Sequence, residues 1–534
     1  MSKMDVRRKQ VEFFSAALAV LILWIFGERV GEYGIAYLTG ALLCMAALWT
    51  MIGVHLAEAL GKMLRSRNAR GQYRNAAGSR RNIMTLQGAF GLLGSLALLF
   101  LAAPIAQGLI GMAECTLIIR VLAPYLFLHT IASVLKGYLL GARAELPVCI
   151  GSLLRQALIL FFGLLLEGRF HAYGDMVSAL LGPRKFSYMY GVVGICIGFS
   201  LAELVEILFL FVMYQRFGKM SYKQEAEGRR ITESFGTHLR VAYGYRWPAL
   251  LMRALELLPF FAGTCLFMQK QTDKNTAVVN LGGFFGGYLA QCGFIVLLSA
   301  GLLLPVCTRI VSLMRKEEQR YARSCFLGGL HAGIVHALFW SVLLMVLAEQ
   351  AGELLPLGGQ LTGRLLAQGA ALILPAVLCF YFFRLLTGFG GQYLVAGIKV
   401  VGAIVFVAVF LILSGNGQGI QAMVPGLLIS AVIECLLSGF LVFRQLRAGA
   451  DLLLCGVAPT GAVCGVGLLC LLLKKLLMPH LGAMVTMAIC VVCGGFVYWS
   501  LLILLRNFKE EELEIIPGGK IIRAMGEMLH IYKV

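Results

Sequence analysis

Long apolar stretches alternate with short polar ones along this chain, and the apolar stretches are long enough to cross a bilayer. A helix needs about 20 apolar residues to span the hydrocarbon layer. Counting stretches of that length predicts fourteen helices. The predicted helices cover 11–27, 35–60, 85–110, 116–140, 145–166, 189–213, 239–268, 279–305, 324–348, 363–387, 391–413, 419–443, 451–476 and 482–505. We therefore expect an all-α polytopic membrane protein.

The composition supports this class. Apolar residues make up 59% of the 534 positions, charged residues only 14%, and the mean hydropathy is +0.84. A soluble domain could not bury so much apolar surface. The 15 cysteines lie mostly in apolar runs, which indicates that they act as small hydrophobic residues. The CVVC motif at 490–493 also lies in an apolar span, and no second CxxC motif accompanies it. The residues predict no cofactor and no metal site. The basic segment 1–10 lacks a following cleavage site, so we expect a retained first helix rather than a signal peptide.

Loop charges predict the orientation, because cytoplasmic loops are enriched in lysine and arginine. The segment 61–82 contains seven cations and no acid. The other basic loops are 214–238, 309–323 and 444–447. Loops 27–34 and 349–360, predicted outside, are poor in cations, whereas the outer loop 167–187 is an exception with Arg169, Arg184 and Lys185. We expect both termini in the cytoplasm. The net charge of +19 then faces anionic lipid, and no nucleic acid need be invoked.

The chain also contains an internal repeat. Segment 61–84 resembles 308–333, and 120–141 resembles 364–388, at an offset of about 250 residues. Two lobes of six helices, followed by two more helices, are therefore predicted, with a cavity between the lobes. The expected division is an N-terminal lobe at 1–216, a cytoplasmic linker at 217–238, a C-terminal lobe at 239–446, two further helices at 447–506 and a cytoplasmic tail at 507–534.

Two segments carry a resemblance to a known family. The run RVLAPYLFLHTIASVLKGYLLGARAELPVCIGSLLRQ (120–156) resembles helices 4 and 5 of stage V sporulation protein B-like polysaccharide transporters, a branch of the multidrug/oligosaccharidyl-lipid/polysaccharide (MOP) flippase superfamily. The tail EEELEIIPGGKIIRAMGE (510–527) resembles the end of the same branch. The resemblance implies a V-shaped, MATE-like pair of lobes and carriage of polyprenyl-diphosphate-linked sugars. In contrast to lipid II flippases of this superfamily, helix 11–27 carries no cation within its membrane span.

Three charges interrupt the predicted helix 239–268. Arg253 lies about fourteen residues, or about 20 Å, into the helix, near mid-membrane. Arg246 and Glu256 share its face, because they lie seven residues before and three residues after it. A charge at this depth is costly. Two interpretations remain: an Arg253–Glu256 ion pair with a snorkelling Arg246, or arginines that bind phosphate in a central cavity. Prolines at 248 and 259 are expected to bend the helix.

Further charges occupy equivalent helices of the two halves. Arg155 and Lys399 lie inside the fifth helix of each half, where they could meet an anionic group or could be placed near the cytoplasmic ends by chance. Lys136 and Arg384 end the preceding helices and are expected to have surface roles.

The acids inside the spans are coupling or gating candidates: Glu58, Glu203, Glu206 and Glu434. Glu203 and Glu206 share one helical face and could bind a coupling ion, H⁺ or Na⁺, or pair with Arg155 or Lys399 to keep the lobes closed. His331 and His336 are five residues apart, which does not fit the metal-binding spacing.

These features favour a non-enzymatic flippase of the bacterial plasma membrane that moves a lipid-linked oligosaccharide or a similar anionic polyprenyl-diphosphate lipid. The arginines would hold its diphosphate through paired hydrogen bonds. An ion-coupled multidrug or cation antiporter of the same superfamily is the alternative. A membrane-embedded glycosyltransferase is less favoured, because the longest outer loop offers only Glu167 and Asp175 as carboxylates.

Overall fold

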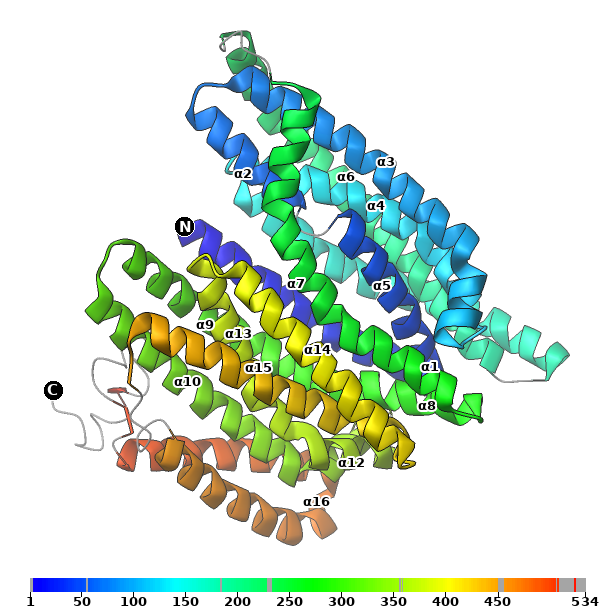
Figure 1. The fold of residues 1–534 in the computed structure, drawn as a ribbon. Helices are drawn as coiled ribbons and strands as arrows, with labels where there is room; N and C mark the ends of the chain where they lie inside the picture. Colours follow the sequence, from blue (N-terminus) through cyan, green and yellow to red (C-terminus); the bar gives the residue numbers. More distant parts are fainter. Residues whose placement is uncertain are drawn as a thin grey trace. The chain divides into compact units, whose positions relative to one another are not determined.

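The computed structural model describes residues 3–53, 56–182, 185–227, 233–354, 357, 359–449, 456–505, 507–508 and 523–524. Throughout these residues the secondary structure is helical, without a β-strand (Figure 1). The all-α class predicted from the apolar stretches is confirmed. The predicted tail, 507–534, lies largely outside the described residues, and residues 450–455, where a further helix was predicted to begin, lie wholly outside them.

Two compact units make up the chain. One comprises Leu21–Gly282, and the other comprises Met1–Val20 together with Gly283–Val534. Packing therefore groups the helices at 235–282 with the N-terminal helices, whereas the sequence repeat places them at the start of the second half. The division of the chain into two lobes of six helices, which rests on the sequence repeat, stays a prediction. The predicted linker 217–238 is helical up to Glu227, and residues 228–232 lie outside the described residues.

The first unit is built from the end of α1 and the helices that follow it. Its elements are α1 (Lys3–Ile52), α2 (Leu56–Ala69), α3 (Tyr73–Ala103), η1 (Pro104–Ile110), α4 (Cys115–Gly141), α5 (Glu145–Leu181), α6 (Lys185–Glu227), α7 (Phe235–Lys270) and α8 (Lys274–Gly282). The elements of the second unit are η2 (Gly283–Leu289), α9 (Ala290–Arg315), α10 (Gln319–Val346), α11 (Ala348–Leu354), α12 (Gly359–Gly369), η3 (Ala370–Leu372), α13 (Ile373–Gly388), α14 (Gln392–Gly415), η4 (Gly419–Ala422), α15 (Met423–Leu446) and α16 (Ala458–Leu504).

The number of membrane crossings agrees with the sequence prediction. Twelve stretches of the described residues are long and apolar enough to span a membrane. Two of these, Val6–Ala69 and Ala458–Leu504, are long stretches broken by a glycine in the left-handed region, Gly31 (φ 62°) and Gly482 (φ 72°). Only glycine adopts such angles without strain, so each marks a sharp break between two crossings. Counting both pieces gives the fourteen predicted helices.

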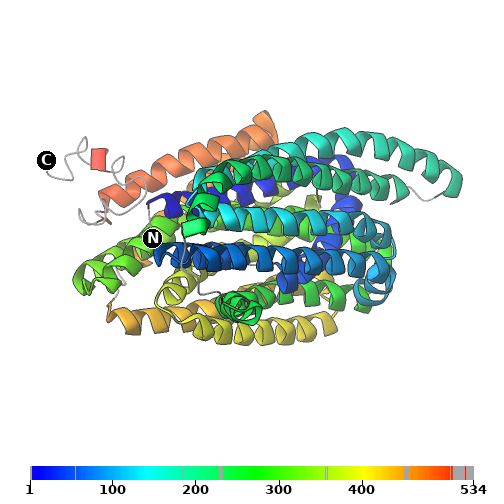
Figure 2. The ribbon, with the colours of Figure 1, turned by 90° about the horizontal axis from the view of Figure 1, so that it is seen from above.

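The outer loop predicted at 167–187 is wrong. Instead, α5 continues to Leu181 and α6 starts at Lys185. The extension is stabilised by helix pairing: a Cβ on Gly194 would lie 2.6 Å from the Leu166 carbonyl oxygen, which shows how closely α6 approaches α5. In Figures 1 and 2 the teal ends of these two helices extend beyond α3 and α4 of the same unit.

Two glycines of the KGYLLG segment set the packing of α4 on α2. A Cβ on Gly137 would lie 2.9 Å from the backbone of Ala57, and one on Gly141 would lie 2.7 Å from the Leu64 side chain. Small residues four apart let two helix backbones approach closely inside a membrane. The motif that carries the family resemblance is therefore explained, in part, by helix packing.

The core of the second unit is formed by large aromatic side chains whose polar ends are satisfied. Tyr498 on α16 is 1% exposed and donates its hydroxyl to the Val335 carbonyl on α10 at 2.9 Å. Tyr381 on α13 is fully buried and donates in the same way to the Phe326 carbonyl at 3.0 Å. Each bond avoids the cost of an unpaired hydroxyl in an apolar core.

Candidate functional site

A cluster of charged side chains is buried in the middle of the first unit. Glu203 and Glu206, both on α6, have side chains with no exposed surface. His129 on α4 places its Nδ1 atom 2.8 Å from Glu203 Oε1. Lys136, also on α4, places Nζ 2.8 Å from Glu206 Oε1. Arg155 on α5 lies 3.7 Å from Glu203 Oε2 and 3.9 Å from Glu206 Oε2.

The register of the three helices explains why these groups meet. Glu203 and Glu206 are one turn apart on α6, and His129 and Lys136 are two turns apart on α4, so each pair shares one helical face. Buried charges are tolerated only when they are paired. Two carboxylates face two permanent cations, Arg155 and Lys136, so the cluster is neutral when His129 is neutral. Its charge therefore changes if His129 gains a proton.

Aromatic rings enclose the histidine of this cluster. The centroid of Trp49 lies 4.5 Å from that of His129, and the Tyr125 ring stacks on His129 with a centroid distance of 5.6 Å. The side chain of His129 is 20% exposed, slightly more than that of Arg155 at 17%. Within the cluster the Arg155 Nε and Glu203 Oε2 atoms are buried and make no hydrogen bond to the described residues.

The second unit contains a simpler counterpart. Lys399 on α14 lies 2.8 Å from Glu434 on α15, and the two side chains are 17% and 12% exposed. The Lys399 ammonium also lies 4.7 Å from the centroid of the Phe383 ring on α13, a cation–π contact. The two units share one arrangement. Arg155 lies ten residues into α5 and pairs with a carboxylate of α6, and Lys399 lies seven residues into α14 and pairs with a carboxylate of α15.

Several sequence expectations can be compared with these contacts. Of the two partners considered for Glu203 and Glu206, Arg155 is the one found, whereas Lys399 pairs with Glu434. The surface role expected for Lys136 is wrong: its side chain is 14% exposed and belongs to the cluster. His129 was not predicted as a site residue. Its seven-residue spacing from Lys136 on an apolar helix was the signal that could have revealed it.

The charged face of α7 is exposed on the surface of the protein. Arg253 donates to Glu256 at 3.0 Å, and the two side chains are 50% and 44% exposed. Arg253 lies near the middle of α7, eighteen residues after Phe235 and seventeen residues before Lys270, and its depth in the membrane stays a prediction. The backbone of Arg246 is helical, but its side chain lies outside the described residues. Pro248 and Pro259 lie inside α7, whose axis changes direction in Figure 1.

Glu58 takes a different position from the other acids. It is half-buried in the first turn of α2, where a carboxylate interacts favourably with the positive end of the helix dipole. A gating or coupling role for Glu58 stays a prediction. The flanking His55 lies outside the described residues.

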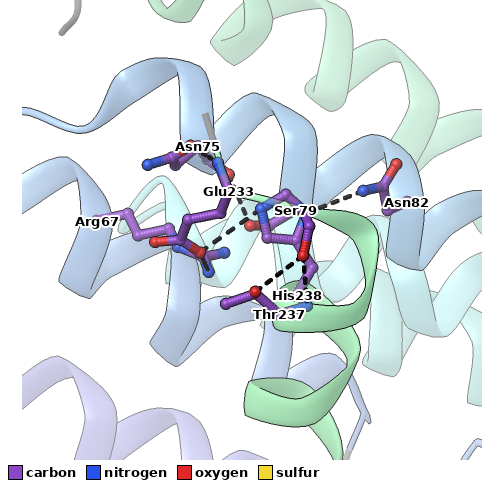
Figure 3. Close-up of polar contacts among 8 residues, drawn as sticks. Arg67, Asn75, Ser79, Asn82, Glu233, Thr237 and His238 are labelled. Carbon is purple, nitrogen blue, oxygen red and sulfur yellow. Dashed lines mark hydrogen bonds and ion pairs between the residues drawn. The ribbon is translucent and has the colours of Figure 1, made fainter. Parts of the chain in front are cut away.

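A second polar network joins the start of α7 to α2 and α3 (Figure 3). Arg67 forms an ion pair with Glu233, and the Glu233 backbone N–H donates to Asn75 Oδ1 at 2.8 Å. The ring of His238 is buried and lies 2.8 Å, through Nδ1, from the Asn82 amide. Burial, and then the charge of Arg67, lowers the pKa of His238. These contacts fix the first turn of α7 to the helices of its own unit.

The histidines considered for metal binding have separate partners. His331 contacts Asn507 at 2.8 Å, and His336 contacts Ser299 at 3.0 Å. Among the described residues, no group of three histidine, cysteine, aspartate or glutamate side chains is arranged to hold a metal ion.

Comparison with known proteins identifies the fold. No protein-family model matches the sequence, and no curated protein matches it either. Among solved structures, an inward-facing MATE-family multidrug resistance transporter of the MOP superfamily is similar, with a TM-score of 0.61, 14% identity, and coverage of 84% of this chain and 99% of that one. The lipid II flippase MurJ in an inward closed conformation gives a TM-score of 0.61 at 14% identity and covers 94% and 99%. A Vibrio cholerae MATE transporter, VcmN, gives 0.57 at 17% identity and covers 84% and 98%. The chain therefore has the fold of MATE and MurJ transporters, as the sequence resemblance predicted.

Proposed function

We propose that this protein is a flippase that moves an anionic lipid-linked saccharide across the bacterial plasma membrane by alternating access. The cargo class is a polyprenyl-diphosphate-linked oligosaccharide or a similar lipid, used for cell-envelope or spore-wall polysaccharide synthesis. The transporter fold and the membrane-spanning helices support the general activity. The choice of an anionic cargo rests on the charges described above.

The observation that carries the proposal is the exposed Arg253–Glu256 pair on a membrane-spanning helix. An exposed charge at this depth faces either lipid or water. Arg253 could reach the interface along its flexible stem, but Glu256 lies inside the span, nine residues after Trp247 and fourteen residues, about 21 Å, before Lys270, and has a short side chain. A carboxylate facing hydrocarbon at that depth costs a few kcal/mol. We infer that this face of α7 lines a water-filled path, where Arg253 can bind a diphosphate bidentately.

The charge balance of the buried cluster argues against cationic cargo. An antiporter for cationic drugs needs a net negative site, but Glu203 and Glu206 are already matched by Arg155 and Lys136. The MATE-like fold keeps an ion-coupled multidrug antiporter as the second candidate. The glycosyltransferase alternative loses one of its two carboxylates, because Glu167 is buried beside His171, with 3.4 Å between Oε1 and Nδ1, in the helical extension.

We further propose that the buried cluster couples transport to an ion. His129 is its most exposed member, and protonation would add one positive charge next to Glu203. That change would alter how strongly α4 and α5 are held to α6, and so favour one lobe conformation. H⁺ fits this arrangement better than Na⁺, because both carboxylates already have cationic partners. Glu434, paired with Lys399, would act in the same way in the second unit.

Proteoliposome flipping of a polyprenyl-diphosphate-linked sugar tests the cargo assignment. Arg253→Ala should abolish flipping in a protein that remains inserted and folded. Arg253→Lys should retain part of the activity, since a point charge cannot reproduce paired hydrogen bonds. Arg240→Ala is the matched control, because Arg240 is exposed on the same helix thirteen residues before Arg253.

The double variant Arg253→Met with Glu256→Met separates binding from structure. If Arg253 only neutralises Glu256, this variant should be stable and active, and the cargo assignment would be wrong. A stable but inactive double variant would support Arg253 as the group that holds phosphate. If the double variant still takes up a cationic dye, the antiporter function would be favoured instead.

A further inference from the structure

A stripe of polar side chains runs along the end of α5. Its members are spaced by four, four and three residues, so they share one helical face. They are Glu167, His171, Asp175 and Ser178. This face packs closely on α6, because a Cβ on Gly174 would lie 2.7 Å from the Ser187 Cα atom. Paired membrane helices usually place small and apolar residues between them, so the stripe indicates a role other than packing.

A cavity of about 570 Å³ opens between this stripe and the start of α6. Such a volume is typical of small-molecule sites, which range from about 300 to about 1,000 Å³. The described polar and aromatic residues that line it are His171, Asp175, Ser178, Ser187 and Tyr188. All of them belong to the first unit and lie in the teal ends of α5 and α6 in Figure 1. The described lining includes no residue of α7, so the cavity is separate from the charged face of that helix.

The length of α5 bears on where this cavity lies in the membrane. His171 follows Glu145, the first residue of α5, by 26 residues, which is a rise of about 39 Å. Even at a tilt of about 40°, the upper end of the usual range, the rise along the membrane normal is about 30 Å, the thickness of the hydrocarbon layer. The loop charges predict that α5 begins at the cytoplasmic surface. We therefore expect the cavity to face water or headgroups on the outer side.

The hydrogen bonds in the cavity wall have a fixed direction. Ser187 donates its hydroxyl to Asp175 Oδ1 at 2.6 Å, which uses its only proton. The Oγ atoms of Ser178 and Ser187 lie 3.1 Å apart, so Ser178 is the donor in that bond. Ser178 keeps lone pairs, and a carboxylate can accept about four hydrogen bonds, of which Ser187 supplies one. The wall therefore offers mainly acceptors, and it suits a ligand that carries several hydroxyl donors.

Tyr188 gives the cavity an aromatic wall. Its ring stacks on that of Tyr33 from α1, with 6.0 Å between centroids and an interplanar angle of 7°. The edge of the contact is closed by His171, whose ring lies 5.9 Å away at 71°. His171 is held in turn by Glu167, with 3.4 Å between Nδ1 and Oε1. The face of an aromatic ring carries partial negative charge and attracts the C–H groups of a ligand.

We propose that this cavity binds a saccharide. Neighbouring hydroxyls of a sugar ring can donate to Asp175 and Ser178, while the C–H groups of the ring face pack on Tyr188. A linear polyol offers the same donors without a rigid C–H face, so a sugar ring fits both walls better. The inference rests on this cavity alone and is independent of the cargo binding proposed for Arg253.

Saturation-transfer NMR with the disaccharides cellobiose and N,N′-diacetylchitobiose tests the site. Both have equatorial ring substituents, which leave C–H groups on the ring faces. The full-length protein is held in nanodiscs, because the sugar headgroups of maltoside detergents would compete. Asp175→Asn should lower the affinity about tenfold, since a hydrogen bond to a charged acceptor contributes about that factor. The asparagine oxygen can still accept from Ser187, so the wall itself is retained.

The aromatic wall is tested separately. Tyr188→Leu should lower the affinity about fivefold, whereas Tyr188→Phe, which keeps the ring, should change it little. If Tyr188→Leu does not fold, Ala179→Phe takes its place. Ala179 is exposed and lines the cavity, so the larger side chain should block binding without disturbing the core.

Two matched controls alter the same groups outside the cavity. Asp273→Asn changes an exposed aspartate that also accepts from a hydroxyl, that of Thr276. Tyr173→Leu changes an exposed tyrosine of α5 whose ring packs on Tyr190. Both variants should bind the disaccharides like the wild type. Equal losses in Asp175→Asn and Asp273→Asn, or no saturation transfer to either disaccharide, would overturn the site. Mannitol, a linear polyol, binding as tightly as the disaccharides would overturn the saccharide assignment.

Proteoliposome flipping by Asp175→Asn distinguishes two sources of the sugar. Reduced flipping by a variant that has lost disaccharide binding would assign the site to the sugar of the cargo. Unchanged flipping would assign it to a separate saccharide outside the membrane. The binding measurement does not require transport, so failure of the flippase proposal would leave its outcome unchanged.

Discussion

Replacing Arg155 with methionine would remove one of the two permanent cations from the buried cluster of the first unit. Arg155 lies 3.7 Å from Glu203 and 3.9 Å from Glu206, and neither glutamate has exposed surface. At an effective dielectric constant of about 20, each contact contributes roughly 4 kcal/mol of attraction. Desolvation of the guanidinium offsets part of this. Because removal leaves a buried carboxylate without its partner, we expect a net loss of about 3–5 kcal/mol in the free energy of unfolding.

Adding Glu203→Gln to Arg155→Met restores the charge balance, with Lys136 still facing Glu206. The double variant should therefore recover more than half of the loss. Thermal unfolding in detergent, followed by intrinsic fluorescence, measures both variants and gives the coupling energy between the two positions. Arg240→Met is the control for removal of an exposed arginine. The charge-balance argument would be refuted if Arg155→Met were as stable as the wild type, or if the double variant were no more stable than the single one.

Three further predictions concern other parts of the molecule. Burial lowers the pKa of His238, so the folded state disfavours the protonated ring. The contribution of His238 to the stability of the α7 start should therefore be complete above about pH 6.5. It should decrease as the pH is lowered from there toward the depressed pKa of the folded state. Hydrogen exchange at the start of α7 should show this fall, and His238→Gln should remove it. Gly141→Leu would force α2 from α4 and should cost about 1–3 kcal/mol in thermal unfolding, whereas Gly88→Leu, with open space around it, should cost much less. A cysteine introduced at Gln72 should react with an impermeant thiol reagent added on the cytoplasmic side, and one introduced at Asp273 should react with the reagent added outside. Labelling of both cysteines from the same side would contradict the topology.

The sequence predicted the helices well because the length of an apolar stretch is a direct physical requirement of the bilayer. It failed at 167–187, where Glu167, Arg169 and Asp175 interrupt the apolar pattern. In the structure Glu167 lies beside His171 on the next turn, and Asp175 accepts a hydrogen bond from Ser187 across the two helices. Polar residues that satisfy one another inside a helix pair look like a loop when only hydropathy is considered.

The site was predicted only in part, for a related reason. Glu203 and Glu206 could be recognised because their spacing places both acids on one face of a single helix. The seven-residue spacing of His129 and Lys136 places both on one face of α4, but their carboxylate partners follow only from the packing of α4 against α6. Arg253 was correctly placed beside Glu256 by spacing alone. Its depth in the membrane stays a prediction.

The continuous α5–α6 pair has a practical consequence for observing transport. The α5 span of 36 residues, Glu145–Leu180, is about 54 Å long, against a hydrocarbon layer of about 30 Å. The span is therefore about 24 Å longer than the hydrocarbon layer. A small tilt of so long a helix displaces its far end, where Leu180 is 86% exposed, by a larger amount. If the first unit rocks as the proposed alternating access requires, a fluorophore attached at Leu180 would report that movement away from the cargo path.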